Sequence, residues 1–223
     1  PPERALWARE AAARSVWDRL RGAGAAAPGL ALCEEPPVRL VRGLLDPGCA
    51  AGLLAEARFD VVTRRRRREG ADVAPGRIAS LIRRRVADAL GLGEPYLEPL
   101  RLVRYSRPGD TFEPHVDWTV DAADPQLALL GQRVATGLVY LADLPEGVGG
   151  ETHFPHLNLS VTPRAGAALL WPNVDASGRP LPETLHEARP LEAEGVWKAA
   201  VNVWARDRPL PTDEAVLAGL LLS

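Results

Sequence analysis

Cysteine is scarce in this chain of 223 residues, and methionine is missing altogether. Cys33 and Cys49 are the only cysteines, too few for a disulfide scaffold, so two reduced, half-buried thiols are the simpler expectation. Because the chain begins with proline and contains no methionine, we expect that the natural start is trimmed or not included. A missing signal peptide therefore excludes little, and both the cytoplasm and the lumen of the secretory pathway stay open.

Long apolar runs, an excess of one charge and phosphate-binding loops are also lacking. No run approaches the roughly 18–20 apolar residues of a transmembrane helix. With 27 basic and 29 acidic residues, no global attraction to nucleic acid or acidic membranes is expected. There is no internal repeat and no GxGxxG or Walker-type loop, which disfavours a nucleotide-binding fold. A hydrophobic content of 46% predicts one soluble domain with a substantial core.

Helical patterns dominate the first part of the chain. Alanine-rich residues 3–21 predict a first helix, and residues 46–58 predict a second with Asp46 as its N-cap. Residues 75–90 place their large apolar side chains on one face and predict a third. Between the first two helices, the alternation over residues 36–45 indicates a short strand.

From residue 100 onward, short β-rich runs alternate with glycine and proline turns. These runs are residues 100–105, 136–143, 157–163, 166–171 and 198–205. Several short strands at such intervals predict a sandwich or barrel.

His115, Asp117 and His186 form the most informative pattern. In a strand, residues i and i+2 share a face, so the side chains of His115 and Asp117 would converge and a third ligand would come from a distant segment. Two histidines and one carboxylate are the ligand set of non-haem Fe(II) sites with open coordination positions. The tripeptide alone is common, and a structural histidine beside a surface aspartate would be its default explanation. His153 and His156 are rival ligands, which we expect to be surface or strand histidines.

An ordered series of motifs surrounds these three residues. It comprises residues 105–109, 112–117, 133–143, 149–155, 161–167, 186–190 and 195–198, with Trp204 six positions further on. Over roughly residues 76–206 the series resembles the prolyl 4-hydroxylase-like branch of the Fe(II)- and 2-oxoglutarate-dependent oxygenases.

The resemblance implies an α+β, mainly β fold: a double-stranded β-helix, or jelly roll, with N-terminal helices packed on one sheet. Residues 1–75 would then be a helical and strand support region of the same domain. Residues 76–210 would form the jelly-roll oxygenase core, and residues 211–223 a C-terminal helical tail. The predicted strands and leading helices agree with this fold independently.

The resemblance also implies a reaction. Fe(II) would be held by His115, Asp117 and His186, with 2-oxoglutarate as cosubstrate, O2 as oxidant and ascorbate as a reductant. Succinate and CO2 would be released while a prolyl residue of a peptide or protein is hydroxylated, with no nucleic acid or membrane as partner. The alternatives are hydroxylation of a free amino acid or small metabolite, and a non-catalytic jelly-roll binding module. An arginine-rich nucleic-acid-binding domain has the least support.

Lys198 is the only lysine in the chain, all other basic residues being arginine. It matches the family position that pairs with the distal carboxylate of 2-oxoglutarate, where a compact ammonium fits. Tyr105 and Thr136 match positions whose hydroxyls assist that carboxylate, and Trp204 matches a tryptophan near the site. The plainer alternatives are an exposed strand lysine, a core tyrosine, a strand threonine and a core tryptophan.

Three features depart from the family pattern. Phe112 stands where many prolyl hydroxylases have tyrosine, and the segment from His186 to Lys198 is slightly longer than usual. Before residue 76, five consecutive arginines, residues 64–68, replace the serine-rich stretch that folds over a peptide substrate. They are either a solvated loop or a clamp for an acidic substrate or nucleic acid. Phe112, Trp204 and Arg66 are therefore the candidate substrate residues.

Overall fold

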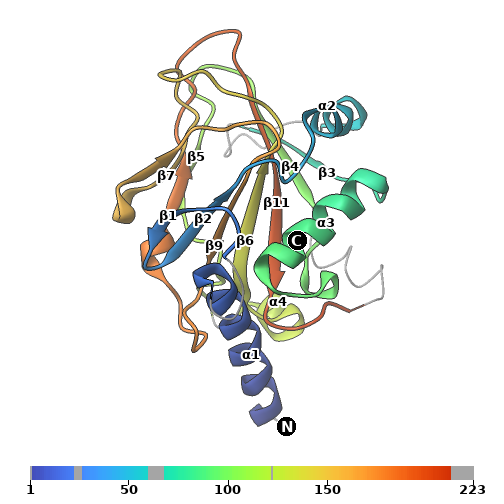
Figure 1. Ribbon diagram of the computed structural model, residues 1–223, viewed down its shortest axis with the longest axis vertical. Coiled ribbons are helices and arrows are strands. Elements are labelled where there is room, and N and C mark those ends of the chain that lie inside the picture. The colour runs from blue at the N-terminus through green and yellow to red at the C-terminus, as the bar shows by residue number, and fades with distance from the viewer. Residues whose placement is uncertain (1, 23–26, 60–67, 122, 212–223) are drawn as a thin grey trace.

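The computed structural model describes residues 2–22, 27–59, 68–121 and 123–211 (Figure 1). Arg66 and most of the predicted C-terminal tail, residues 211–223, lie outside this part. The helices are α1 (Pro2–Arg21), α2 (Pro47–Glu56), α3 (Arg77–Leu90) and α4 (Pro125–Leu130), with 3-10 turns at Glu94–Tyr96, Pro155–Leu157 and Pro182–Thr184. The strands are β1 (Leu30–Glu34), β2 (Pro37–Val41), β3 (Glu69–Asp72), β4 (Arg101–Tyr105), β5 (Phe112–His115), β6 (Arg133–Tyr140), β7 (Thr152–Phe154), β8 (Leu159–Val161), β9 (Ala168–Pro172), β10 (His186–Ala188) and β11 (Lys198–Arg206).

The strands form two antiparallel sheets. The larger has seven strands in the order β1-β2-β9-β6-β11-β4-β3, and the smaller has four in the order β5-β10-β7-β8. Neighbours in each sheet are mostly distant in sequence, as in a jelly roll. Figure 1 shows α1 and α3 on one side of the larger sheet and the smaller sheet on its other side. The prediction of a mainly β jelly roll with helices on one sheet is confirmed.

Strand alternation gives the larger sheet two apolar faces. Along β6, Val139 belongs to the core shared with the helices, while Leu138 and Tyr140 belong to the core between the sheets. On the helix side, Val16 of α1 and Ile82 of α3 are fully buried. Successive side chains of a strand point to opposite faces, so a sheet covered on both sides reads as a nearly continuous apolar run.

The local signals for the three predicted helices are confirmed. The Asp46 carboxylate accepts a hydrogen bond from the Gly48 N–H at the start of α2. α3 ends at Gly91, whose φ of 71° is the left-handed conformation that favours glycine at a helix C-terminus. The elements that went unpredicted include β1, β3, β7, β10 and α4. β1 and β3 are edge strands with mixed burial, so neither carries a clear alternation.

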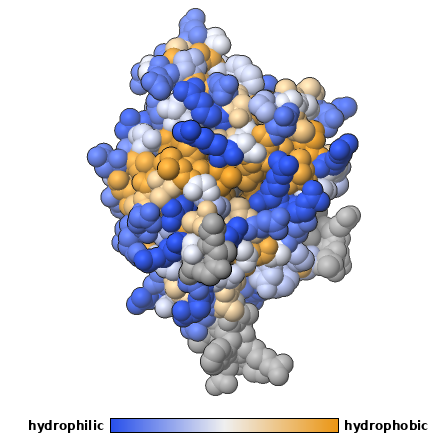
Figure 2. All heavy atoms as spheres, in the orientation of Figure 1, coloured by the Kyte–Doolittle hydropathy of each residue, from blue (hydrophilic) through white to orange (hydrophobic). Residues whose placement is uncertain are grey.

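The surface of the described part is mixed in polarity. Figure 2 shows apolar side chains gathered in a band across the middle of the face seen in Figure 1, with hydrophilic side chains above and below. The exposed large hydrophobic side chains of this part are Leu30, Val120, Leu129 and Trp197. No helix within the described residues is long and apolar enough to cross a membrane.

The contact between α3 and β6 generates a stability prediction. A Cβ atom at Gly137 would lie 2.8 Å from Cγ1 of Val86 and 3.2 Å from Cδ2 of Leu170. Gly137→Ala should therefore lower the free energy of unfolding by about 1–3 kcal/mol through overpacking. Val86→Ala opens space for the added methyl group, so the double variant should be more stable than the two single effects predict, by about 0.5 kcal/mol or more. Denaturant unfolding gives the free energy of unfolding of the wild type, the two single variants and the double variant. If the losses in the two single variants simply add in the double variant, this packing is contradicted.

Candidate active site

The two candidate histidine ligands are direct cross-strand partners. β10 pairs antiparallel with β5 in a register that sets His186 opposite His115. Opposed residues of neighbouring strands point to the same face, so the two imidazoles meet, with ring centroids 4.3 Å apart. Residues 71 positions apart in the chain are thus joined by a single strand pairing.

Backbone carbonyls orient both imidazole rings. Nδ1 of His115 lies 2.8 Å from the Glu113 carbonyl oxygen, and Nδ1 of His186 lies 2.9 Å from the Thr184 carbonyl oxygen. Because a carbonyl oxygen only accepts, Nδ1 is assigned the proton in each ring and Nε2 keeps its lone pair. This tautomer is the one that binds a metal through Nε2.

Asp117 joins the histidines from a bend, not from a strand. β5 ends at His115, so the expectation that His115 and Asp117 share one strand face is wrong. The bend after His115 instead turns the carboxylate toward both rings. Asp117 Oδ1 lies 3.8 Å from Nε2 of His115, and Oδ2 lies 3.7 Å from Nε2 of His186.

A short chain of hydrogen bonds holds the Asp117 carboxylate. The Thr136 hydroxyl donates to Asp117 Oδ2 at 2.7 Å, and the Asn173 amide donates to the Thr136 oxygen at 3.0 Å. All three residues are buried. Thr136 was predicted to assist the cosubstrate carboxylate, and the structure places its hydroxyl against a metal-ligand candidate instead.

Burial and neighbouring charges keep His115 and Asp117 in their ligating protonation states. Burial, and then the nearby His186, lower the pKa of His115 to about 4. Burial alone would raise the pKa of Asp117, but the two histidines, Arg133 and the Thr136 hydroxyl outweigh it and lower the pKa. Metal ligands must be deprotonated, and near neutral pH His115 is neutral and Asp117 is charged.

The donor set fits a divalent metal ion. His115, Asp117 and His186 each offer one ligand atom, and these atoms lie within 4.8 Å of one another. The Asp117 oxygens lie 3.8 and 3.7 Å from the Nε2 atoms of His115 and His186, so one ion could contact all three side chains after they move closer together. Two imidazoles and one carboxylate leave positions open, which matches non-haem Fe(II).

Lys198 lies in the same space between the sheets, with 2% of its surface exposed. Its ammonium contacts the Thr152 hydroxyl at 3.4 Å, and Nζ lies 5.4 Å from the centroid of the Tyr105 ring. Among the described residues no carboxylate oxygen lies within 4.0 Å of Nζ. Burial lowers the pKa of Lys198 to about 7, although the charge of Glu151 acts in the opposite direction. A buried ammonium without a carboxylate in contact is costly, and a bound carboxylate would relieve that cost.

Two hydroxyl residues beside Lys198 escaped sequence reasoning. Tyr140 donates a hydrogen bond to the Thr152 hydroxyl at 2.9 Å, and both side chains are buried. Thr152 pairs with Ala188, two residues along β10 from His186, which is about 7 Å at the usual strand rise. The hydroxyl that Lys198 contacts thus lies on the strand beside β10, close to His186. Tyr140 and Thr152 lie in motifs that had been noted, but their side-chain directions depend on strand register.

Aromatic rings line the triad. The Phe112 ring lies 3.8 Å from that of His115, and Trp171 packs edge-on against His186 at 4.9 Å. Trp204, predicted to lie near the site, is the cross-strand partner of Thr136, and its ring stacks on the guanidinium of Arg133 at 4.0 Å. The indole N–H groups of Trp171 and Trp204 are buried and have no acceptor within the described part of the chain. A bound polar molecule could accept from them.

The remaining histidines lie elsewhere. Nδ1 of His153 faces the Leu159 carbonyl and the Ser160 hydroxyl, and Nδ1 of His156 faces the Pro182 carbonyl. Neither belongs to the cluster that could hold a metal.

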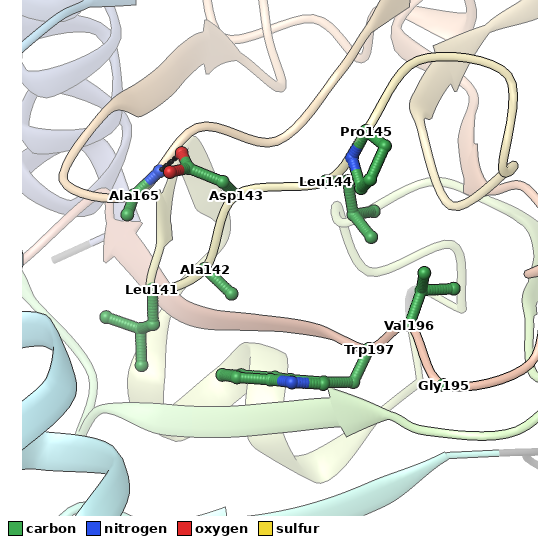
Figure 3. Close-up of a pocket in the computed structure, with 9 residues that line it drawn as sticks. All are labelled: Leu141, Ala142, Asp143, Leu144, Pro145, Ala165, Gly195, Val196 and Trp197. Carbon is green, nitrogen blue, oxygen red and sulfur yellow. Dashed lines mark hydrogen bonds between the residues drawn. The ribbon is translucent and has the colours of Figure 1, made fainter.

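A cavity of about 400 Å³ lies apart from the triad. Figure 3 shows it between the turn at Leu141, Asp143 and Pro145 and the segment that ends at Trp197, whose indole lies along one wall. The Asp143 carboxylate accepts a hydrogen bond from the Ala165 N–H. No cation and no candidate metal ligand except this occupied carboxylate lines the cavity. It therefore cannot serve a dicarboxylate cosubstrate and a metal ion together.

Comparison with known proteins agrees with this geometry. Residues 100–206 match the 2OG-Fe(II) oxygenase superfamily. Human prolyl 4-hydroxylase subunit alpha-1 is 35% identical over 133 residues, which are 59% of this chain and 24% of that protein. The chain thus spans about a quarter of the length of the curated relatives it matches.

Solved structures show the same likeness. A viral collagen prolyl hydroxylase from Paramecium Bursaria Chlorella virus-1, in complex with 2OG, is 26% identical with a TM-score of 0.63. The match covers 78% of this chain and 98% of that one. A Pseudomonas putida prolyl-4-hydroxylase, 18% identical with a TM-score of 0.52 over 77% and 92% of the two chains, shares the fold.

The fold, the ligand set and the sequence match all resemble one class of enzyme, the 2-oxoglutarate-dependent dioxygenases that use Fe(II). Within that class, the human and viral proteins that this chain resembles are prolyl hydroxylases.

The hydrogen bond from Thr136 generates a prediction about metal affinity. Thr136→Val keeps the side-chain shape but removes the donor to Asp117 Oδ2, so the affinity for Fe(II) should fall about 10–100-fold. Anaerobic metal titration measures it. Thr162→Val, in the loop after β8, is the matched control and should bind the metal as the wild type does. Equal affinities for the wild type and Thr136→Val would contradict the role of this hydroxyl.

Lys198 generates a prediction about pH. A carboxylate beside the ammonium favours its charged form, so the pKa of about 7 must rise when 2-oxoglutarate binds. Binding then takes up a proton above pH 7, and the dissociation constant should increase by up to about tenfold per pH unit from there. The arginine of Lys198→Arg stays charged across this range, so the dissociation constant of this variant should not depend on pH there. A dissociation constant that does not change between about pH 7 and 9 in the wild type would refute this account.

Proposed function

We propose that this protein hydroxylates prolyl residues of a peptide or protein, consuming 2-oxoglutarate and O2 and releasing succinate and CO2. The observation that carries the proposal is the pairing of two sites in one buried space. The triad His115, Asp117 and His186 faces the same inter-sheet core as Lys198, a buried ammonium with no carboxylate oxygen within 4.0 Å among the described residues. A metal site would explain the triad, but it would not explain a buried ammonium in the same space.

The residues have distinct roles in this proposal. His115, Asp117 and His186 hold Fe(II), which together with 2-oxoglutarate supplies the oxidising chemistry. Thr136 keeps the Asp117 carboxylate turned toward the imidazoles. Lys198, with the Thr152 hydroxyl, binds the distal carboxylate of the cosubstrate.

Tyr105 and Tyr140 complete the far end of the space. Their buried hydroxyls stay protonated because burial raises the pKa of both phenols. The Tyr140 hydroxyl orients Thr152. Phe112 and Trp171 pack against the histidine rings and keep water from the reacting centre.

The substrate assignment draws on the relatives. The human subunit and the viral protein are named as prolyl hydroxylases, the latter as a collagen prolyl hydroxylase. The match to the family model, residues 100–206, contains the triad and Lys198. Free proline or another small molecule is the second candidate, because the serine-rich segment of peptide hydroxylases is replaced here by arginines. Ascorbate is proposed as the reductant that restores Fe(II).

The first test separates an enzyme from a binding module. Anaerobic addition of Fe(II) and 2-oxoglutarate should produce the weak visible absorption of their chelate in the wild type. Asp117→Ala and His186→Ala each remove one ligand and should abolish it, while His153→Ala, the matched control, should retain it. If the wild type shows neither this absorption nor affinity for 2-oxoglutarate, the assignment as a 2-oxoglutarate-dependent enzyme is refuted.

The second test identifies the substrate. Proline-rich peptides and free L-proline are incubated with the loaded enzyme in air, and mass spectrometry looks for the gain of one oxygen atom. Gain on a peptide proline supports the main proposal, and gain on free proline alone supports the second candidate. Consumption of 2-oxoglutarate without either product would contradict both.

A further inference from the structure

Arg68 is the one member of the arginine run, residues 64–68, within the described part of the chain. It immediately precedes β3, the edge strand of the larger sheet. Its guanidinium carbon lies 3.6 Å from the centroid of the Phe112 ring, which belongs to β5, the edge strand of the smaller sheet. Nη1 lies 3.4 Å from the Tyr105 hydroxyl. The side chain therefore spans the gap between the two sheets at their common edge.

This edge is the open side of the triad. The side chain of His115 is 25% exposed, whereas those of Asp117 and His186 are 5% and 8% exposed. The Phe112 ring on which Arg68 lies is itself stacked on His115. The charge of Arg68 also contributes to lowering the pKa of His115 and of Lys198. The guanidinium thus lies where a substrate would approach the metal.

Within the described part of the chain, Arg68 has no acidic partner. Its contacts are the Phe112 ring and the Tyr105 hydroxyl. The neighbouring Glu69 is already paired with Arg104 across β3 and β4. Lys198, in contrast, is deeply buried and already assigned to the distal carboxylate of 2-oxoglutarate. The site therefore holds a second cation, half-buried and nearer to solvent, whose anion the cosubstrate does not account for.

The chemistry of this cation favours a carboxylate. A guanidinium offers two parallel N–H groups that match both oxygens of a carboxylate, and stacking on an aromatic face fixes its plane in advance. Phe112, present where many prolyl hydroxylases have tyrosine, supplies that face without a competing hydroxyl.

We propose that Arg68 is a specificity-determining residue that binds a carboxylate of the substrate. The carboxylate is an acidic side chain beside the target proline, or the α-carboxylate of proline itself. The inference rests on the proposed function and deepens it, because it names the chemistry of the substrate.

The experiment measures binding to the protein loaded with Fe(II) and 2-oxoglutarate without oxygen. One probe pair consists of end-capped proline peptides that carry glutamate or glutamine next to the proline. The other pair is L-proline and L-prolinamide. The wild type should bind the acidic member of at least one pair about tenfold or more tightly than the neutral member. The pair that shows this preference identifies the source of the carboxylate.

Arg68→Gln should abolish the preference while keeping the affinity for the neutral member and the absorption of the Fe(II) and 2-oxoglutarate chelate. Arg68→Lys keeps the charge but loses the planar guanidinium, so it should retain a reduced preference for the acidic member. It also keeps the experiment interpretable if Arg68→Gln fails to fold. Arg84→Gln, which removes an exposed arginine from α3, is the matched control and should behave as the wild type does.

Three results would overturn the proposal: no acidic preference in the wild type, a preference that persists in Arg68→Gln, or weaker 2-oxoglutarate binding in that variant. The last result would place Arg68 in the cosubstrate site. Failure of the proposed function is seen separately, as absence of the chelate absorption from the wild type or of hydroxylated product in air.

Discussion

The register between β5 and β10 is the constraint on which the rest of the site depends. It sets His115 and His186 opposite each other and turns both rings toward the inter-sheet core. Because side chains alternate along a strand, a slip of one residue would move one histidine to the other face and dissolve the triad. The carbonyls of Glu113 and Thr184, each two residues before a histidine, fix the two ring orientations.

The site is electrostatically incomplete without ligands. Among the described residues, Lys198 is buried with no carboxylate in contact, Arg68 stacks on an aromatic ring without an acidic partner, and the triad places two lone pairs and a carboxylate around one point. Each arrangement costs free energy in an empty protein, and each is relieved by a group of opposite character. Burial thus explains the low pKa of Lys198 and its readiness to bind an anion.

A buried ionic cluster supports the carboxylate side of the triad. Arg133 donates to both oxygens of Glu98 at 2.7 and 2.8 Å, and Arg206 donates to Oε1 of the same carboxylate at 2.5 Å. Burial would lower the pKa of Arg133, but Glu98 outweighs it and raises the pKa. The guanidinium therefore stays charged, helps keep the pKa of Asp117 low, and holds the Trp204 ring beside Thr136. Removing Glu98 would leave the buried Arg206 and the half-buried Arg133 without their carboxylate.

The sequence by itself predicted the candidate metal ligands, the single lysine, the three leading helices and the jelly-roll class. These predictions follow from residue types, spacing and resemblance. Local rules suffice there, because caps, helical periodicity and motif order are properties of nearby residues. Only the tertiary structure decided that Asp117 reaches the triad from a bend, that Thr136 serves Asp117, that Thr152 and Tyr140 join Lys198, and that Arg68 lies on Phe112. These facts depend on which strands pair and in what register, and pairing between residues far apart in the chain is set by the packing of the whole core.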